Sequence, residues 1–415
     1  MNDSLVPAGM GRADGPPIPP IVTPESRRDP YPLFRQLREH SPVHFDEATS
    51  SWYVSRYTDV AELLLDPRLG AHDFPEWIHG LPEPDRSVIV PVEEHLARWP
   101  VFSDRPAQVR LRRLLQPALT RSAVQELEPE ITRTARRVAA ALPAGPADLL
   151  ADFARPAARW TVARLLGLPE EAGRQLEEWS DPLIDYVGTP GMDVAAALGA
   201  APAVAALTGF VHEELLPRAS TPAAVALARA TRDPEVEPED VVAMVAQLVT
   251  GGIEPTATAT CVAALRTTGA GGGQESAETE TEIETEIEIE EALRADPPFQ
   301  IAVREAKTSF DHRGHRFTAG QRVVLLLASA GQDDSGTRGR GGCPVTGAGR
   351  GSEPHLAFGR GRHYCLGAPL ARLHLRAALS ALREAGVPAR IDRAAVVRGE
   401  FFGLAAYRAV PLRAR

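Results

Sequence analysis

Apolar side chains recur at helical spacing along most of the chain. Leucine, valine and alanine return every three or four residues, which places them on one face of a helix. The predicted helices cover 29–40, 59–65, 106–142, 146–218, 223–232, 238–266 and 366–385. Strand-like runs are short and comprise 52–54, a turn and strand within 316–330, and the tail after 385. The pattern predicts a mainly α-helical fold with small β-sheets.

Three segments depart from this periodicity. Residues 1–27 are rich in proline and glycine and are expected to form a flexible arm. Residues 71–100 show no clear period, so we expect a long irregular segment that serves as a substrate loop. Residues 268–290 run from glycines into glutamates that alternate with threonine and isoleucine. This period of two is strand-like, and glutamates four apart would repel on a helix, so we expect a solvated insert without chemistry.

The helix predicted over 238–266 contains an interruption at its centre. Gly251, Gly252 and Pro255 lie within five residues of one another. A proline there removes a backbone N–H and kinks the helix, which costs stability. The cluster therefore suggests that a ligand approaches the backbone closely at this point.

Composition narrows the class of protein. The 415 residues carry a formal charge of −10, which argues against a general nucleic-acid binder. Nine glutamates fall within 275–291, so the rest of the chain is close to neutral. Three cysteines do not make a disulfide framework. The best candidates for a membrane-spanning segment are 241–249 and 323–330, and both are too short to span a membrane. The N-terminal residues lack the basic-then-apolar pattern of a signal peptide. We therefore expect a soluble, cytoplasmic protein.

One cysteine lies in a distinctive setting. The segment 358–372 reads FGRGRHYCLGAPLAR, with Cys365 between glycines and just before a predicted helix. Glycines permit tight turns and the close approach of a flat ligand, and a helix N-terminus stabilises a thiolate. A thiolate is the axial ligand that promotes O–O cleavage on haem iron. A small buried hydrophobic residue and a cysteine nucleophile are the alternatives.

The whole segment resembles the haem-binding signature of the cytochrome P450 family, F-G-x-G-x-H-x-C-x-G-x-x-L-A-R. Every fixed position matches, and these are Phe358, Gly359, Gly361, His363, Cys365, Gly367, Leu370, Ala371 and Arg372. The resemblance extends over 28–415 and is closest to soluble bacterial members. It implies one catalytic domain over that range, with a triangular helical body, small sheets, and haem b between two long helices. It makes Cys365 the iron ligand and places Phe358, Gly359 and Gly367 beside the cofactor.

Further residues match family positions that hold the haem propionates. Arg112, Arg304 and His363 are implied as propionate contacts. Gln108 stands where the family usually has histidine, and it can donate a hydrogen bond but carries no charge. Glu291 and Arg294 match a buried structural pair, since residues three apart share one helix face.

The interrupted helix matches the family's oxygen-activating segment. The resemblance implies that Gly252 admits O2 and that Glu254 relays protons. The next position usually holds a threonine, but this chain has Pro255. Thr256 could replace that hydroxyl if the proline distorts the turn. A structural carboxylate remains the alternative for Glu254.

The resemblance implies a haem-thiolate monooxygenase that oxidises or hydroxylates a small organic substrate with O2 and two electrons. It also implies ferredoxin and ferredoxin reductase as electron donors, which Arg338, Arg340 and Arg350 would attract. Bacterial relatives suggest the tailoring of a natural product such as a polyketide or peptide, free or bound to a carrier protein. A peroxide-driven, coupling or dehydrating haem enzyme is the alternative, because Pro255 replaces threonine. A non-enzymatic partner protein is a third hypothesis, which the intact cysteine motif disfavours.

Overall fold

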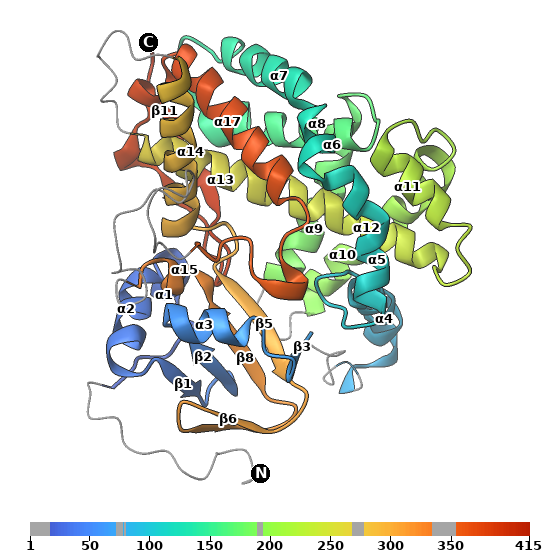
Figure 1. Ribbon diagram of the computed structural model, residues 1–415, viewed down its shortest axis with the longest axis vertical. Helices are drawn as coiled ribbons and strands as arrows, with labels where there is room; N and C mark the ends of the chain where they lie inside the picture. Colours follow the sequence, from blue (N-terminus) through green and yellow to red (C-terminus); the bar gives the residue numbers. More distant parts are fainter. Residues whose placement is uncertain (1–16, 72–77, 79, 189–193, 268–277, 334–353) are drawn as a thin grey trace. The chain divides into compact units, whose positions relative to one another are not determined.

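The computed structural model describes residues 17–71, 78, 80–188, 194–267, 278–333 and 354–415 (Figure 1). By their internal contacts the residues form two compact units. Unit 1 comprises Met1–Asp73, Leu293–Cys365 and Gly399–Ala406. Unit 2 comprises Phe74–Ala292, Leu366–Arg398 and Tyr407–Arg415. A single catalytic domain over 28–415 remains a prediction.

Unit 1 is built on a five-stranded sheet with the order β1-β2-β8-β5-β3. Its strands are β1 (Val43–Asp46), β2 (Ser51–Val54), β3 (Leu69–Gly70), β5 (Ile301–Ala306) and β8 (Arg322–Leu326). β2 and β8 are parallel, and the other pairs are antiparallel. The hairpin of β6 (Phe310–His312) and β7 (His315–Phe317) and the helices α1 (Pro24–Arg28), α2 (Tyr31–His40), α3 (Tyr57–Leu63), η5 (Gly361–His363) and α15 (Leu327–Gly331) complete it.

Both faces of this sheet are buried, which explains the apolar run in β8. Val323 and Leu325 pack with Trp52 in one cluster, while Val324 packs with Tyr53 in the cluster on the other face. Since successive side chains of a strand point to opposite faces, a strand covered on both sides is apolar throughout.

Unit 2 is almost entirely helical (Figure 1). Its first helices are α4 (Glu83–Ala97), α5 (Ala107–Leu115), η2 (Gln116–Leu119), α6 (Arg121–Gln125), α7 (Glu128–Ala140), η3 (Leu150–Ala154), α8 (Arg155–Leu165), α9 (Ala172–Gly188), α10 (Val194–Phe210), η4 (Val211–Leu215) and α11 (Pro222–Ala230). Then follow α12 (Pro238–Gly252), α13 (Glu254–Arg266), α14 (Glu278–Ala295), α17 (Ala368–Glu384), η6 (Val387–Arg390) and η7 (Arg393–Ala395). The short strands β4 (Ala147–Asp148), β9 (Val397–Arg398), β10 (Tyr407–Ala409) and β11 (Pro411–Leu412) form two antiparallel pairs. The mainly α prediction is thus confirmed.

The predicted interruption of the 238–266 helix is present. α12 ends at Gly252, and α13 begins at Glu254 with Pro255 in its first turn. A proline is tolerated there because its missing N–H would have no partner within the helix. Ile253 joins the two helices, and the Ala257 N–H donates to its carbonyl at 2.9 Å.

The flexible arm predicted for 1–27 is wrong for its C-terminal end, which is packed and partly helical. Residues 1–16 lie outside the described part of the chain. Ile21 is fully buried, and α1 begins at Pro24 after a Thr23 cap that accepts a hydrogen bond from the Ser26 N–H. This end of the arm is therefore packed into unit 1.

The irregular segment predicted for 71–100 is wrong for half of its length, and residues 72–77 and 79 lie outside the described part of the chain. Helix α4 occupies Glu83–Ala97 and contains Pro91. Ile89, Val92 and Leu96 are buried at spacings of three and four, which is helical. The prolines concealed this period.

The expectation that no apolar run could span a membrane is also wrong. Residues Val194–Leu215 form a helix of 22 residues whose length and apolar composition would suffice to cross one. Of its most apolar window of 18 residues, 28% is buried. Alanine and glycine supply 10 of the 22 residues, and the helices of soluble proteins can pass the same test.

The glutamate-rich insert is helical from residue 278 onward, which corrects the strand-like reading. Glutamates of α14 form ion pairs with arginines of α17, and these pairs hold the two helices together. Arg372 binds Glu290 with two hydrogen bonds of 2.6 and 2.9 Å. Arg376 binds Glu286 at 2.7 Å, and Arg383 pairs with Glu288. Arginines from a distant helix therefore offset the repulsion between neighbouring glutamates.

Candidate functional site

The cysteine loop is described within unit 1. The Cys365 N–H donates to Phe358 O at 2.8 Å, and the Tyr364 N–H donates to Gly361 O at 3.1 Å. These bonds fold 358–365 into a closed loop that carries an exposed Cys365. The cysteine is therefore not a buried hydrophobic residue.

Two glycines are required by this loop. Gly359 and Gly361 have φ values of 70° and 68°, in the left-handed region that disfavours other residues. A Cβ on Gly361 would also lie 2.7 Å from Leu65 Cδ2, the residue that follows α3 by two positions. The glycines thus fix the path of the backbone next to the cysteine.

Other predicted residues occupy the same unit. Arg304 lies on β5, is buried, and donates through Nη1 to Val303 O at 2.8 Å. His363 ends η5, two residues before Cys365. The Phe358 ring lies 6.4 Å from that of Tyr364 and 5.8 Å from that of His355. Arg294 of the predicted structural pair donates from Nη1 to Gly331 O at 2.8 Å. Glu291, three residues earlier on α14, belongs to unit 2.

In unit 2, Gln108 and Arg112 lie four residues apart on α5. Residues at this spacing share one helix face. Gln108 is buried and Arg112 is half-buried. Gly367 caps α17, and its carbonyl accepts the Ala371 N–H at 2.9 Å.

The glycines that end α12 have different surroundings. A Cβ on Gly252 would lie 2.7 Å from Val162 Cγ2, so this glycine permits the close packing of α12 on α8. Nothing in the described residues lies within 4 Å of a Cβ on Gly251, which is exposed within an otherwise buried stretch. Thr256 is partly exposed on the next turn.

Glu254 is held by partners on two sides. It is buried, and its Oε2 lies 2.8 Å from Arg155 Nη2 of α8. Its Oε1 lies 3.4 Å from Thr258 Oγ1. Burial raises the pKa of the Glu254 carboxyl, and the positive charge of Arg155 opposes that rise.

Arg155 links Glu254 to two acids of α9. Its Nη1 lies 3.3 Å from Glu177 Oε1 and 3.6 Å from Asp181 Oδ2. Arg159 binds Glu177 from the other side at 2.7 Å. The Asp181 side chain is 45% exposed, so this chain of charges reaches from a buried carboxylate to solvent. Burial also raises the pKa of Asp181, against the effect of Arg155.

No local feature of the sequence indicates this network. Arg155 and Glu254 are almost one hundred residues apart, and Arg155 is one of many arginines. Only the packing of α8 against α9 and α13 brings their charges together.

Comparison with known proteins finds relatives over most of the chain. No protein-family model matches the chain. The vitamin D(3) 25-hydroxylase of Pseudonocardia autotrophica is 31% identical over 366 residues, covering 86% of each chain. A biotin biosynthesis cytochrome P450 of Bacillus subtilis is 27% identical over 87% of this chain and 90% of its own. The cyclomarin C epoxidase CymV of Salinispora arenicola is 27% identical, covering 88% and 90%.

The chain belongs to the cytochrome P450 family. It is thus an oxidoreductase of a family of haem-dependent monooxygenases. Solved P450 structures share its fold. Epothilone D-bound P450epoK matches with a TM-score of 0.80 at 22% identity, covering 97% of this chain and all of that one. P450BioI, in complex with an acyl carrier protein that carries a fatty acid, matches with 0.77 at 23%, covering 94% and 99%.

The donor set of this P450 is suited to haem. Unit 1 offers an exposed thiol on a loop whose backbone turns at Gly359 and Gly361, two residues without a Cβ. Unit 2 offers open space beside Gly251, near the end of α12. Gln108, Arg112, Arg304 and His363 supply hydrogen-bond donors of the kind that propionates need.

A buried histidine on α17 should make this P450 sensitive to acid. His374 Nδ1 lies 3.0 Å from Thr161 Oγ1, and burial lowers the pKa of His374 to about 4 from 6.5. Above pH 6.5 the imidazole is neutral in both states, so it contributes no pH dependence. As the pH falls toward 4, only the unfolded chain binds this proton, and we expect a loss of about 3 kcal/mol.

The measurement is the free energy of unfolding of wild-type and His374→Gln protein across this pH range. The variant should lose less stability on acidification than the wild type, while His40→Gln, at an exposed site, should follow the wild type. Equal acid dependence of all three proteins would contradict the assignment.

Proposed function

We propose that this P450 uses haem b, bound through Cys365, to oxidise or hydroxylate a small natural product. The exposed thiol of Cys365 on its glycine loop carries the proposal, because the loop presents a sulfur ligand within a complete family motif. When bound, the cofactor supplies the chemistry that activates O2 with two electrons and transfers one oxygen atom to substrate.

The chain's own residues would bind the cofactor and handle protons. Cys365 would hold the iron, with Phe358, Gly359 and Gly367 shaping the backbone beside it. Gln108, Arg112, Arg304 and His363 would hold the propionates. Gly251, which has open space beside it, would admit O2 in place of the predicted Gly252, which packs on α8. Glu254 would release and regain a proton at its carboxylate, positioned by Arg155.

The relatives support a proposal for the electron donors and the class of substrate. Bacterial P450s take electrons from redox partners, and we propose ferredoxin with its reductase in this case. Arg338, Arg340 and Arg350, which were expected to attract ferredoxin, lie outside the described residues. CymV and P450epoK support a natural product such as a polyketide or peptide, and P450BioI supports a carrier-bound one. The proposed place of action is the cytoplasm.

A peroxide-driven, coupling or dehydrating reaction is the second candidate. Pro255 supplies no hydroxyl, and Thr258 Oγ1 lies against the Glu254 carboxylate. Thr256, which is partly exposed, could still supply a hydroxyl for proton delivery. If it does not, a reaction that needs no such hydroxyl is favoured.

Turnover of a substrate that shifts the haem spectrum tests the two candidates. The monooxygenase should be faster with ferredoxin, its reductase and NADPH than with hydrogen peroxide. Thr256→Ala should lower the share of electrons that reach product, while Thr260→Ala, whose buried hydroxyl donates to Thr256 O at 2.9 Å, should not. Equal or faster turnover with peroxide would favour the second candidate.

A further inference from the structure

A cluster of possible metal ligands lies in unit 1, where the β6–β7 hairpin meets α3. Asp59 and Glu62 are three residues apart on α3, and His312 is the last residue of β6. Their ligand atoms all lie within 4.8 Å of one another. Neither the cysteine loop nor the helices around Glu254 include these residues.

The cluster has a buried half and an exposed half. The side chains of Asp59 and His312 are only 6% and 5% exposed. His312 Nε2 is buried, makes no hydrogen bond, and lies 3.5 Å from Asp59 Oδ1. Glu62 is 58% exposed, so it can move toward the other two. A buried imidazole nitrogen without a hydrogen bond is costly unless something binds it.

Arg313 covers the exposed half. Its Nε lies 2.7 Å from Asp59 Oδ1 and its Nη2 lies 3.2 Å from Glu62 Oε2. The residue adopts a φ of 49°, which is unusual outside glycine, at the hairpin turn before Gly314. Its side chain is 55% exposed, so the guanidinium can swing into water without disturbing the core.

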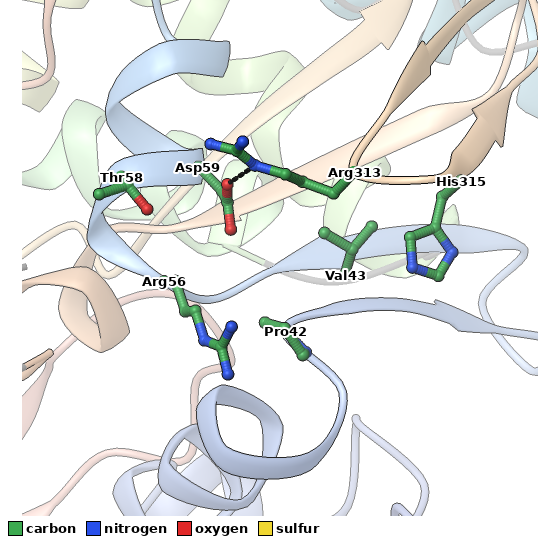
Figure 2. Close-up of a pocket in the computed structure, with 7 residues that line it drawn as sticks. All are labelled: Pro42, Val43, Arg56, Thr58, Asp59, Arg313 and His315. Atoms are coloured by element: carbon green, nitrogen blue, oxygen red, sulfur yellow. Dashed lines mark hydrogen bonds and ion pairs between the residues drawn. The ribbon is translucent and has the colours of Figure 1, made fainter. Parts of the chain in front are cut away.

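A cavity next to Asp59 leaves room for water. Figure 2 shows Asp59 and Arg313 joined by their ion pair, with Arg56 and His315 on other sides of this pocket. The space measures about 370 Å³. Water molecules could therefore complete the coordination of an ion held by the side chains.

We propose that Asp59, Glu62 and His312 bind a divalent transition-metal ion of the Zn²⁺ class, and that Arg313 covers the site when no ion is bound. One imidazole and two carboxylates are a ligand set that Zn²⁺ accepts, with water in the fourth position. Ligand atoms of a tetrahedral zinc site lie about 3.3 Å apart, so the exposed Glu62 needs to move inward by a modest amount.

Charge favours replacement of the Arg313 guanidinium by a divalent ion. With Arg313 in place, two carboxylates face one positive charge, whereas a divalent ion balances both. The guanidinium offers hydrogen bonds to Asp59 and Glu62, but the ion also binds the His312 nitrogen. The ion would tie the hairpin to α3, and Leu65, two residues after this helix, lies beside Gly361 of the cysteine loop.

Calorimetric titration of the full-length protein with ZnCl₂ tests the proposal. We expect one saturable site and a rise of the melting temperature with Zn²⁺. Glu62→Gln, at an exposed position, should weaken this binding by about tenfold or more, and His312→Gln should do the same. Arg313→Ala should strengthen binding by about fivefold, because it removes the competing ion pairs.

Arg316→Ala is the matched control, since this exposed arginine of β7 pairs with Asp311 at 2.9 Å and should leave zinc binding unchanged. Tighter binding by Arg313→Ala together with weaker binding by Glu62→Gln supports the site. Failure of both wild-type and Arg313→Ala protein to bind Zn²⁺ would overturn it. Equal affinity of wild-type and Glu62→Gln protein would overturn it as well, even if His312→Gln does not fold.

Discussion

Replacement of Cys365 by serine is expected to abolish the thiolate spectrum and the oxygen-dependent activity. The sulfur is exposed on a loop fixed by its N–H bond to Phe358 O, so serine can be accommodated without repacking. A hydroxyl does not supply the electron density that a thiolate gives to haem iron. The reduced, carbon monoxide-bound variant should lack the Soret band that gives the family its name, and turnover with O2 should fall to background.

The matched control is Cys261→Ala. Cys261 is fully buried on α13, and burial raises the pKa of its thiol, so it remains a neutral core residue. This variant should keep the spectrum even if it loses some stability. A wild-type spectrum in Cys365→Ser protein would show that another group binds the iron.

Replacement of Arg155 by alanine is expected to give a large loss of stability, of about 2 kcal/mol near neutral pH. The variant leaves Glu254 without its partner at 2.8 Å and removes the contacts to Glu177 and Asp181. The Arg155 side chain is 29% exposed, so water should relieve part of the cost of a fully buried unpaired charge.

The pH dependence of the stability loss in Arg155→Ala tests whether the unpaired Glu254 carboxylate causes it. Burial already raises the folded-state pKa of Glu254, and removal of Arg155 should raise it further. The folded protein then binds a proton at a higher pH than the unfolded chain. The loss from Arg155→Ala should therefore be largest above that raised pKa and shrink as the pH falls through it.

A double-mutant cycle with Glu254→Gln completes the test. Because glutamine carries no charge, Arg155→Ala should cost about 1 kcal/mol less in that background. Arg159→Ala serves as the control, since Arg159 binds Glu177 but makes no described contact with Glu254. Additive losses in chemical denaturation would contradict the proposed coupling between Arg155 and Glu254.

Local sequence was sufficient to predict the features that depend on local chemistry. Gly359, Gly361 and Cys365 lie within seven residues, and the turn geometry of the two glycines follows from residue type, so the loop could be predicted. Pro255 indicated the break between α12 and α13 for the same reason.

Features that depend on distant partners could not be predicted. The alternating glutamates disfavour an isolated helix, and only Arg372, Arg376 and Arg383 of α17 neutralise them. Arg155 has no local mark that distinguishes it from other arginines. In α4, Pro91 within the helix concealed a buried face. Pairing across the fold therefore decided both the shape of the insert and the environment of Glu254.

The most direct test of the central claim is X-ray absorption at the iron edge of the purified resting wild-type protein. Cys365 as the ligand predicts one sulfur atom in the first coordination shell of the iron, in addition to the haem nitrogens. A first shell of nitrogen and oxygen alone would contradict it.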